Sequence, residues 1–220
     1  MTLARPTVMA GMSDEYERFA ELLRTLSEGE WQLETRCAGW RVGDVAAHVV
    51  GTLTDVSNLA LEGLGTPEVT ARQVAQRRDR TAGELADELD AALKRSNDII
   101  SGAGEKAWNQ RGPQPNGKSL GHGVETLWYD TFVHADDIRT AVGKPTQCGQ
   151  GAEASVSHLA DALTDRGWGP ATLQLQGIMQ FQVNGGGRLV TGDPMAFILA
   201  ATGRTDPATI GLDETVNVYA

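Results

Sequence analysis

The apolar residues of this chain follow two different periods, and the change between them limits the folds that it can adopt. In the first part of the chain they recur every three or four positions, which is typical of amphipathic helices. We expect such helices over 13–26, 42–61, 81–100 and 119–143. Four amphipathic helices separated by polar connections predict a four-helix bundle.

The pattern changes after Pro145. A helix is expected at 153–164, and apolar and polar side chains then alternate at 173–175 and 179–183, the period of a half-buried strand. Asp193 followed by proline predicts another helix start, with the acid as cap and proline in the first turn. The tail therefore combines helices and strands, and the sequence predicts an α+β protein.

The connections place the expected domain boundary. The polar, glycine-containing stretch that follows Pro145 predicts a bundle domain over 1–146 and a small α+β domain over 147–220. Residues 101–118 are rich in Gly, Pro and Asn and predict a loop. The chain start is expected to be irregular up to residue 12, and a last strand is expected at 215–219.

Composition excludes several function classes. The formal net charge is −10, which argues against non-specific nucleic-acid binding and against docking on an anionic membrane. No apolar run reaches the length of a membrane span, and the chain start lacks the apolar core of a secretory signal. Cys37 and Cys148 form no C-x-x-C pair, which favours a reducing compartment. We expect a cytoplasmic protein, monomeric or a small homo-oligomer, that acts on a small molecule.

Three residues stand out as candidate metal ligands. Asp130 and His134 are four positions apart in the helix expected at 119–143, so their side chains share one face. His48, in the helix expected at 42–61, is the best candidate for a third ligand. Two histidines and one carboxylate, with positions left for water or substrate, form a recurring catalytic site for zinc or non-haem iron.

Other interpretations of these residues remain open. Asp130 and His134 could simply hydrogen-bond to each other or face solvent. His134 and Asp136 could instead form the H-x-D of an iron site with His158, but residues two apart on a helix point about 200° apart. Asp137, three residues after His134, is a candidate for orienting its imidazole from behind.

The polar stripe that carries His48 is equally ambiguous. It includes Asp44, Thr52 and Asp55, and it is typical either of a solvated face or of a face lining a cavity. Asp44 could orient His48 as Asp137 could orient His134. Among the remaining reactive residues, Cys37 is expected to be a loop or core cysteine, and His122 a residue of the helix start.

One basic cluster interrupts the acidic chain. It consists of Arg72, Arg77, Arg78 and Arg80. A charge run of this kind favours solubility and local ion pairs, and the alternative is a binding place for an anionic substrate.

Three segments resemble a known family. These are 35–50 (TRCAGWRVGDVAAHVV), 130–143 (DTFVHADDIRTAVG) and 190–204 (VTGDPMAFILAATGR). In this order they resemble the mycothiol-dependent maleylpyruvate isomerase family, which joins a DinB-like four-helix bundle to a sterol-carrier-like α+β domain. The resemblance spans nearly the whole chain.

The resemblance implies a site and an activity. The family's metal ligands correspond to His48, Asp130 and His134, with aspartate here where the family's isomerase has glutamate, and zinc is the expected metal. Mycothiol would be the thiol cosubstrate of an isomerase or an S-transferase, and Arg204 corresponds to an arginine near the family's active site that would bind a carboxylate. The alternatives are a zinc hydrolase on the same bundle and a non-catalytic protein that binds a small molecule.

Overall fold

The protein forms two compact units, as a computed structural model that describes residues 3–110 and 117–220 shows. One unit is Met9–Thr146. The other is Gln147–Ala220 together with the start of the chain through Val8. Within the described residues, no helix combines the length and the apolar character that crossing a membrane requires.

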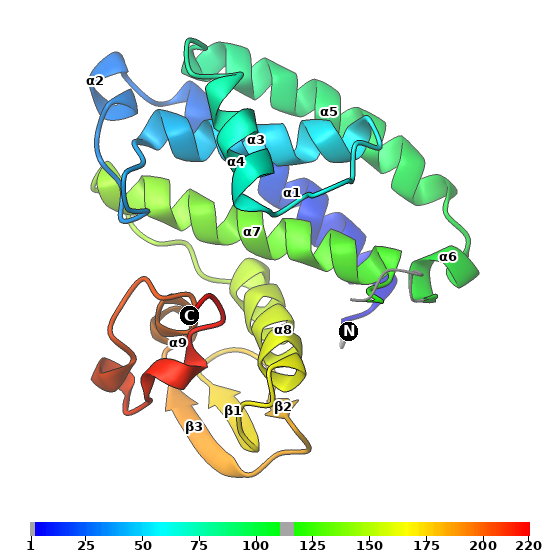
Figure 1. Ribbon diagram of the computed structural model, residues 1–220, viewed down its shortest axis with the longest axis vertical. Coiled ribbons are helices and arrows are strands. Elements are labelled where there is room, and N and C mark those ends of the chain that lie inside the picture. Colours follow the sequence, from blue (N-terminus) through cyan, green and yellow to red (C-terminus); the bar gives the residue numbers. More distant parts are fainter. Residues whose placement is uncertain (1–2, 111–116) are drawn as a thin grey trace. The chain divides into compact units, whose positions relative to one another are not determined.

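Four long helices build the first unit (Figure 1). They are α1 (Arg5–Arg24), α3 (Val42–Ser57), α5 (Ala82–Gly102) and α7 (Leu120–Ala141). Helix α3 contacts both α5 and α7. Helix α1 is tied to α5 by a hydrogen bond of 3.0 Å from Ser13 to Asn97 and by ion pairs from Arg24 to Asp87 and Asp90. The predicted four-helix bundle is confirmed.

Short helices occupy the connections of the bundle. They are α2 (Glu28–Trp31), α4 (Pro67–Ala75) and α6 (Glu105–Asn109). Helix α4 lies across α3 (Figure 1) and contacts it. Helix α6 falls inside the loop expected over 101–118, and residues 111–116 of that loop lie outside the described part of the chain.

Side-chain caps start the helices where the sequence predicts them. Thr81 and Glu84 form a reciprocal capping box at the start of α5, and the Ser119 hydroxyl accepts from the backbone of His122 at the start of α7. Gly143, with a φ of 68°, takes the left-handed conformation just past the end of α7. These local signals need no tertiary contact to act.

Two helix boundaries differ from the prediction. Helix α1 begins at Arg5 and has Pro6 in its first turn. Proline does not interrupt the helix there, since the N–H that it lacks would have no partner within the helix. Ser13, the expected cap, therefore lies inside the helix and faces Asn97. Helix α3 ends at Ser57 rather than near 61, and Leu59 follows with a φ of 58°.

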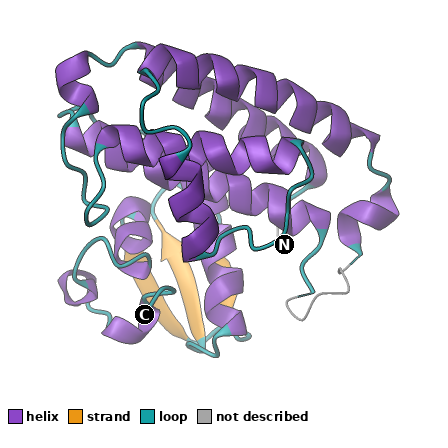
Figure 2. Cartoon of the chain, turned by 45° about the horizontal axis from the view of Figure 1, so that its top comes forward, coloured by secondary structure: helices purple, strands orange, loops and turns teal. Residues whose placement is uncertain are grey.

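The second unit combines helices with a small sheet (Figure 2). Its elements are α8 (Gln150–Asp165), β1 (Ala171–Leu175), β2 (Phe181–Val183), β3 (Arg188–Gly192) and α9 (Pro194–Ala201). The strand order is β2-β1-β3, with β1 antiparallel to β2 and parallel to β3. Leu173 and Phe181 are paired and buried, which confirms the alternation predicted at 173–175 and the α+β class. The strand expected at 179–183 begins only at Phe181, and Met179 lies outside it and is exposed.

The strand expected at 215–219 is wrong. That region overlaps the 3-10 turn Glu214–Val216, and another such turn, Pro207–Ile210, precedes it. Asp213 caps the second turn by accepting from the backbone and the hydroxyl of Thr215. An aspartate that bonds to a backbone N–H two residues ahead favours a turn over an extended strand.

Close packing of α1 on α7 yields a stability prediction. A Cβ on Gly11 would lie 2.1 Å from Trp128, whose indole is fully buried. We expect Gly11→Ala to lower the free energy of unfolding by about 1–3 kcal/mol through overpacking. Gly123→Ala is the control, since no heavy atom lies within 4 Å of its added Cβ. Helix propensity should raise the stability of that variant by about 1 kcal/mol. Equal urea midpoints for Gly11→Ala and wild type would contradict the packing.

Candidate metal centre

The structure brings the three candidate ligands together between α3 and α7. His48 Nε2 lies 3.7 Å from Asp130 Oδ2, and His134 Nε2 lies 3.6 Å from Asp130 Oδ1. One ligand atom from each residue lies within 4.8 Å of the other two. All three side chains are largely but not fully buried, so a ligand from solution can reach them.

These residues fit a divalent cation. Ligand atoms bound tetrahedrally to zinc lie about 3.3–3.6 Å apart, because Zn–N and Zn–O bonds are about 2.0–2.2 Å long. The separations of 3.6 and 3.7 Å are close to that spacing and too long for hydrogen bonds between the side chains. Both Nδ1 atoms have acceptors elsewhere, so the Nε2 atoms are the ones directed at Asp130.

Asp137 supports His134 from behind. Its Oδ2 lies 2.9 Å from His134 Nδ1, and the carboxylate is fully buried. A carboxylate on Nδ1 holds the hydrogen on that nitrogen and leaves the Nε2 lone pair available to a metal. The predicted contact between these two residues is therefore present.

The loop before α3 holds Asp137 in place. Arg36 Nε donates to Asp137 Oδ1 at 2.6 Å, and the Cys37 thiol donates to Asp137 Oδ2 at 3.1 Å. Arg36 also pairs with Asp136. Asp136 is thus engaged by Arg36, and it belongs to none of the possible ligand groups found among the described residues, which disfavours the H-x-D alternative. Cys37 supports a carboxylate, in agreement with the expectation of a loop cysteine.

Gln73 of α4 supports His48 in the same way. Its Oε1 lies 3.1 Å from His48 Nδ1, and its Nε2 donates to Asp55 Oδ2 at 2.7 Å. Asp55 in turn pairs with Arg72 at 2.7 Å. The polar stripe of α3 therefore faces α4 and is not a solvated face. Asp44, expected near His48, instead accepts from the backbone of Arg41 at the helix start.

The pKa values of the two imidazoles are shifted in opposite directions. Burial lowers the pKa of His48, and the nearby Asp130 only partly opposes this effect. Burial acts on His134 in the same direction, but the carboxylates of Asp130 and Asp137 outweigh it and raise its pKa to about 10. His48 is therefore neutral at pH 7 while His134 carries a proton that a metal ion would have to displace.

Trp40 contacts both imidazoles. Its ring centroid lies 5.4 Å from that of His48 in an edge-to-face arrangement and 6.5 Å from that of His134 in a stacked one. The loop that carries it closes on itself through hydrogen bonds from Thr35 to Trp40 and from Trp40 to Cys37. Trp40 thus forms an aromatic wall beside the candidate metal centre.

The basic cluster is used for local ion pairs. Arg72 pairs with Asp55, and Arg77 pairs with Glu88 at 2.5 Å. Arg80 lies 4.0 Å from Glu84. Because Arg77 is buried and both Arg72 and Arg77 already bind carboxylates, these pairings favour the structural interpretation of the cluster over an anion-binding one.

Arg204, the other residue singled out by the sequence, belongs to the second unit. It follows α9, where its backbone N–H bonds to Leu199 and the N–H of Gly203 bonds to Ala200, a Schellman ending. Gly203 has a φ of 70°, as this ending requires. The side chain of Arg204 is half-buried.

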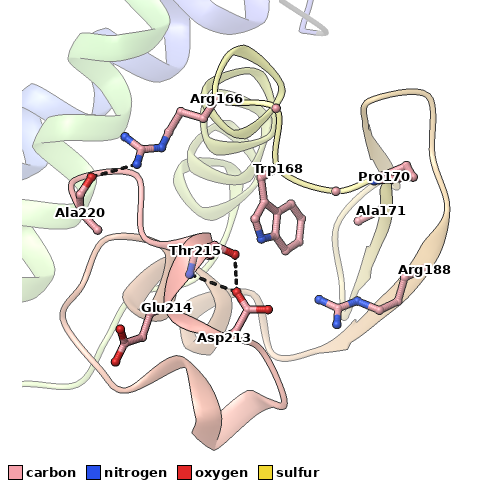
Figure 3. A pocket seen from close by; sticks show the side chains of 11 residues that line it. Arg166, Trp168, Pro170, Ala171, Arg188, Asp213, Glu214, Thr215 and Ala220 are labelled. Atoms are coloured by element: carbon pink, nitrogen blue, oxygen red, sulfur yellow. Dashed lines mark hydrogen bonds between the residues drawn. The ribbon is translucent and has the colours of Figure 1, made fainter.

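The second unit also contains a pocket of about 840 Å³ beside Trp168 (Figure 3). Arg188 lies over the Trp168 ring at 5.9 Å, and Arg166 donates to the backbone oxygens of Val218 and Ala220. The lining of this pocket mixes charged side chains, among them Arg188 and Asp213, with the apolar surfaces of Trp168 and Pro170.

Sequence reasoning missed Gln73 and Arg36. Gln73 lies 25 positions from His48, which it supports, and Arg36 lies 100 and 101 positions from Asp136 and Asp137, which it binds. Neither residue type nor spacing signals such a contact. The loop sequence around Arg36 drew attention only through the family resemblance.

Comparisons with known proteins identify the family and the fold of the chain. Residues 12–139 match the model of the mycothiol maleylpyruvate isomerase N-terminal domain. Crystal structures of a mycothiol-dependent maleylpyruvate isomerase and of its histidine-to-alanine variant share the fold, at 18% identity and a TM-score of 0.63, with 96% of each chain covered. No curated protein matches the sequence. Because the family model covers more than half of the chain, this protein belongs to the mycothiol maleylpyruvate isomerase N-terminal domain family.

Proposed function

We propose that this protein is a metal-dependent enzyme that uses the thiol mycothiol to isomerise, or to add sulfur to, a small electrophilic substrate. The observation that carries the proposal is the convergence of two Nε2 atoms and one carboxylate at 3.6–3.7 Å between α3 and α7. Membership of the family supports the choice of thiol and reaction. The proposal includes a cytoplasmic location, where a thiol cosubstrate stays reduced.

His48, Asp130 and His134 would hold the metal, with zinc as the expected ion. A zinc ion bound by three protein ligands supplies a Lewis acid that lowers the pKa of a thiol or water in its open position. Asp137 and Gln73 keep the Nδ1 hydrogens in place, so that both histidines offer Nε2 lone pairs. Trp40 limits the space beside both rings and so restricts how a thiol and a substrate approach.

The thiol chemistry explains why one site suits two reactions. A thiolate adds to an electron-poor carbon–carbon double bond, so that a C–S bond forms and the π electrons move to the conjugated carbonyl. In an isomerase the adduct rotates about the new single bond and expels the thiolate, which restores the double bond in the trans form. In a transferase the adduct takes a proton and keeps the C–S bond.

Arg204 is proposed to bind a substrate carboxylate. A guanidinium can pair with a carboxylate through two parallel hydrogen bonds, which orients a small acid better than a lysine would. The assignment rests on the family resemblance of segment 190–204. Kinetically, Arg204→Lys should raise KM more than it lowers kcat if the pair forms mainly in the ground state.

Substitution of Asp130 tests the ligand set. We expect Asp130→Ala to abolish stoichiometric zinc binding, because it removes the carboxylate that faces the Nε2 atoms of both histidines. Asp130→Glu should retain or improve zinc binding, since it keeps the ligand type. Elemental analysis of the purified variants and zinc titration against a chelator measure both effects. Full zinc content in the alanine variant would exclude Asp130 as a ligand.

Proton release tests the protonation states. At pH 7 to 8 we expect zinc uptake to release about one proton, because His134 has a pKa of about 10 while burial keeps His48 neutral. The number should fall toward zero as the pH rises past the pKa of His134. Calorimetry in buffers with different ionisation enthalpies counts the protons. Zinc binding without proton release at pH 7 would show that His134 is neutral or is not a ligand.

Thiol dependence tests the reaction. We expect turnover of an activated alkene such as maleylpyruvate to require mycothiol and to be lost with His48→Ala, measured by absorbance or by product analysis. Turnover that ignores mycothiol would instead favour the zinc hydrolase. A wild-type protein without stoichiometric metal would exclude both enzymes and leave a non-catalytic binding protein.

A further inference from the structure

We propose that Gln73 is a positioning residue that selects the tautomer of His48, and that the missing side chain of Gly51 leaves the room that this contact needs. The inference rests on the proposed metal site, in which His48 must present the Nε2 lone pair. It concerns a chain of buried groups that runs from α4 through α3 to the centre. Nothing in the sequence pattern singles out this glutamine.

The orientation of the Gln73 amide follows from its neighbours. Asp55 pairs with Arg72 at 2.7 Å, and the carboxylate of such an ion pair only accepts hydrogen bonds. The amide NH₂ of Gln73 therefore faces Asp55, at 2.7 Å, and its oxygen faces the opposite side. The glutamine itself is 1% exposed, which leaves no water to compensate for a flipped amide.

That orientation determines which nitrogen of His48 carries the hydrogen. Gln73 Oε1 is an acceptor at 3.1 Å from Nδ1, so Nδ1 must be the donor. A neutral imidazole with its hydrogen on Nδ1 has its lone pair on Nε2, the atom that lies 3.7 Å from Asp130. A flipped amide would place NH₂ against Nδ1 and would move the hydrogen to Nε2, where it blocks a metal.

Gly51 permits this contact. A Cβ at this position would lie 2.6 Å from Gln73 Cβ and 2.8 Å from its Cγ, closer than side chains approach in proteins. Gly51 lies in the interior of α3, where glycine is less favourable than alanine. The absence of a side chain there allows α4 to approach closely enough for the glutamine to reach His48.

A role in packing alone predicts something different. If Gln73 only filled space between α3 and α4, an unbranched apolar side chain of similar length would replace it without any effect on the imidazole. If it positions His48, the same replacement changes the tautomer and the metal affinity even where the fold is unaffected. The two roles can therefore be separated by a readout on the histidine itself.

The experiment compares Gln73→Met and Gly51→Ala with a control. Methionine matches glutamine in length but has no amide, and alanine at 51 displaces Gln73 while it favours the helix. The control is Thr52→Val, which removes a neighbouring hydrogen bond of 3.3 Å to the same Oε1 but leaves the glutamine held by Asp55.

Two measurements are made on the full chain. Two-bond ¹H–¹⁵N correlation spectra of the chelator-treated protein, with the His48 signal assigned by its loss in His48→Gln, report the tautomer at mildly alkaline pH. Zinc competition against a chelator reports affinity. We expect the wild type and Thr52→Val to keep the Nδ1–H form. Gln73→Met and Gly51→Ala should shift toward Nε2–H and bind zinc about 10- to 100-fold more weakly.

The outcomes separate the inference from the function on which it rests. An unchanged Nδ1–H tautomer and unchanged zinc affinity in folded Gln73→Met and Gly51→Ala would overturn the positioning role. Lower thermal stability with the same tautomer would also overturn it, in favour of packing. If the wild type binds no zinc but the tautomer shifts as expected, the proposed metal function fails while the role of Gln73 stands.

Discussion

Polar groups that are removed from water need partners, and this requirement organises the bundle around its centre. Helices α3 and α7 present polar side chains to the interior, among them Asp55, Asp136 and Asp137, each less than a tenth exposed. Arg36 reaches in from a loop and Arg72 from α4 to pair with these carboxylates. The loop before α3 and helix α4 are therefore held by the same charges that support the histidines.

The supports of the two histidines differ in kind. His134 has a carboxylate behind it, whereas His48 has an amide whose orientation is set by a carboxylate one step further away. A carboxylate stabilises positive charge on the ring and makes it a stronger donor to a metal, while an amide mainly fixes a tautomer. The support of His134 thus affects the charge of its ring, whereas the support of His48 determines which ring nitrogen carries the hydrogen, although both rings face Asp130.

The helices of the bundle approach one another closely at two glycines, which have no side chain to keep the neighbouring helix away. Gly11 accommodates the buried indole of Trp128 between α1 and α7, and Gly51 accommodates Gln73 between α3 and α4. Each glycine weakens its own helix slightly, and packing across the helix interface offsets the loss. Helix propensity alone would favour alanine at both places.

The sequence by itself determined the four long helices of the bundle, the α+β character of the tail and the choice of His48, Asp130 and His134 as candidate ligands. Apolar periodicity and caps such as Thr81 and Ser119 act within a few residues, so they can be read locally. The segment 35–50, with the D-x-x-x-H of α7, marked the family that the comparison with 12–139 shows.

Only the tertiary structure decided how that centre is supported. Gln73 and Arg36 reach their partners across long sequence separations, and a hydrogen bond depends on distance in space, which no spacing along the chain specifies. The turns after Pro207 were missed because Asp213 competes with strand pairing through a local side-chain contact. Burial lowers the pKa of both His48 and His134, and the carboxylates of Asp130 and Asp137, which the fold places beside His134, reverse this effect at that ring alone.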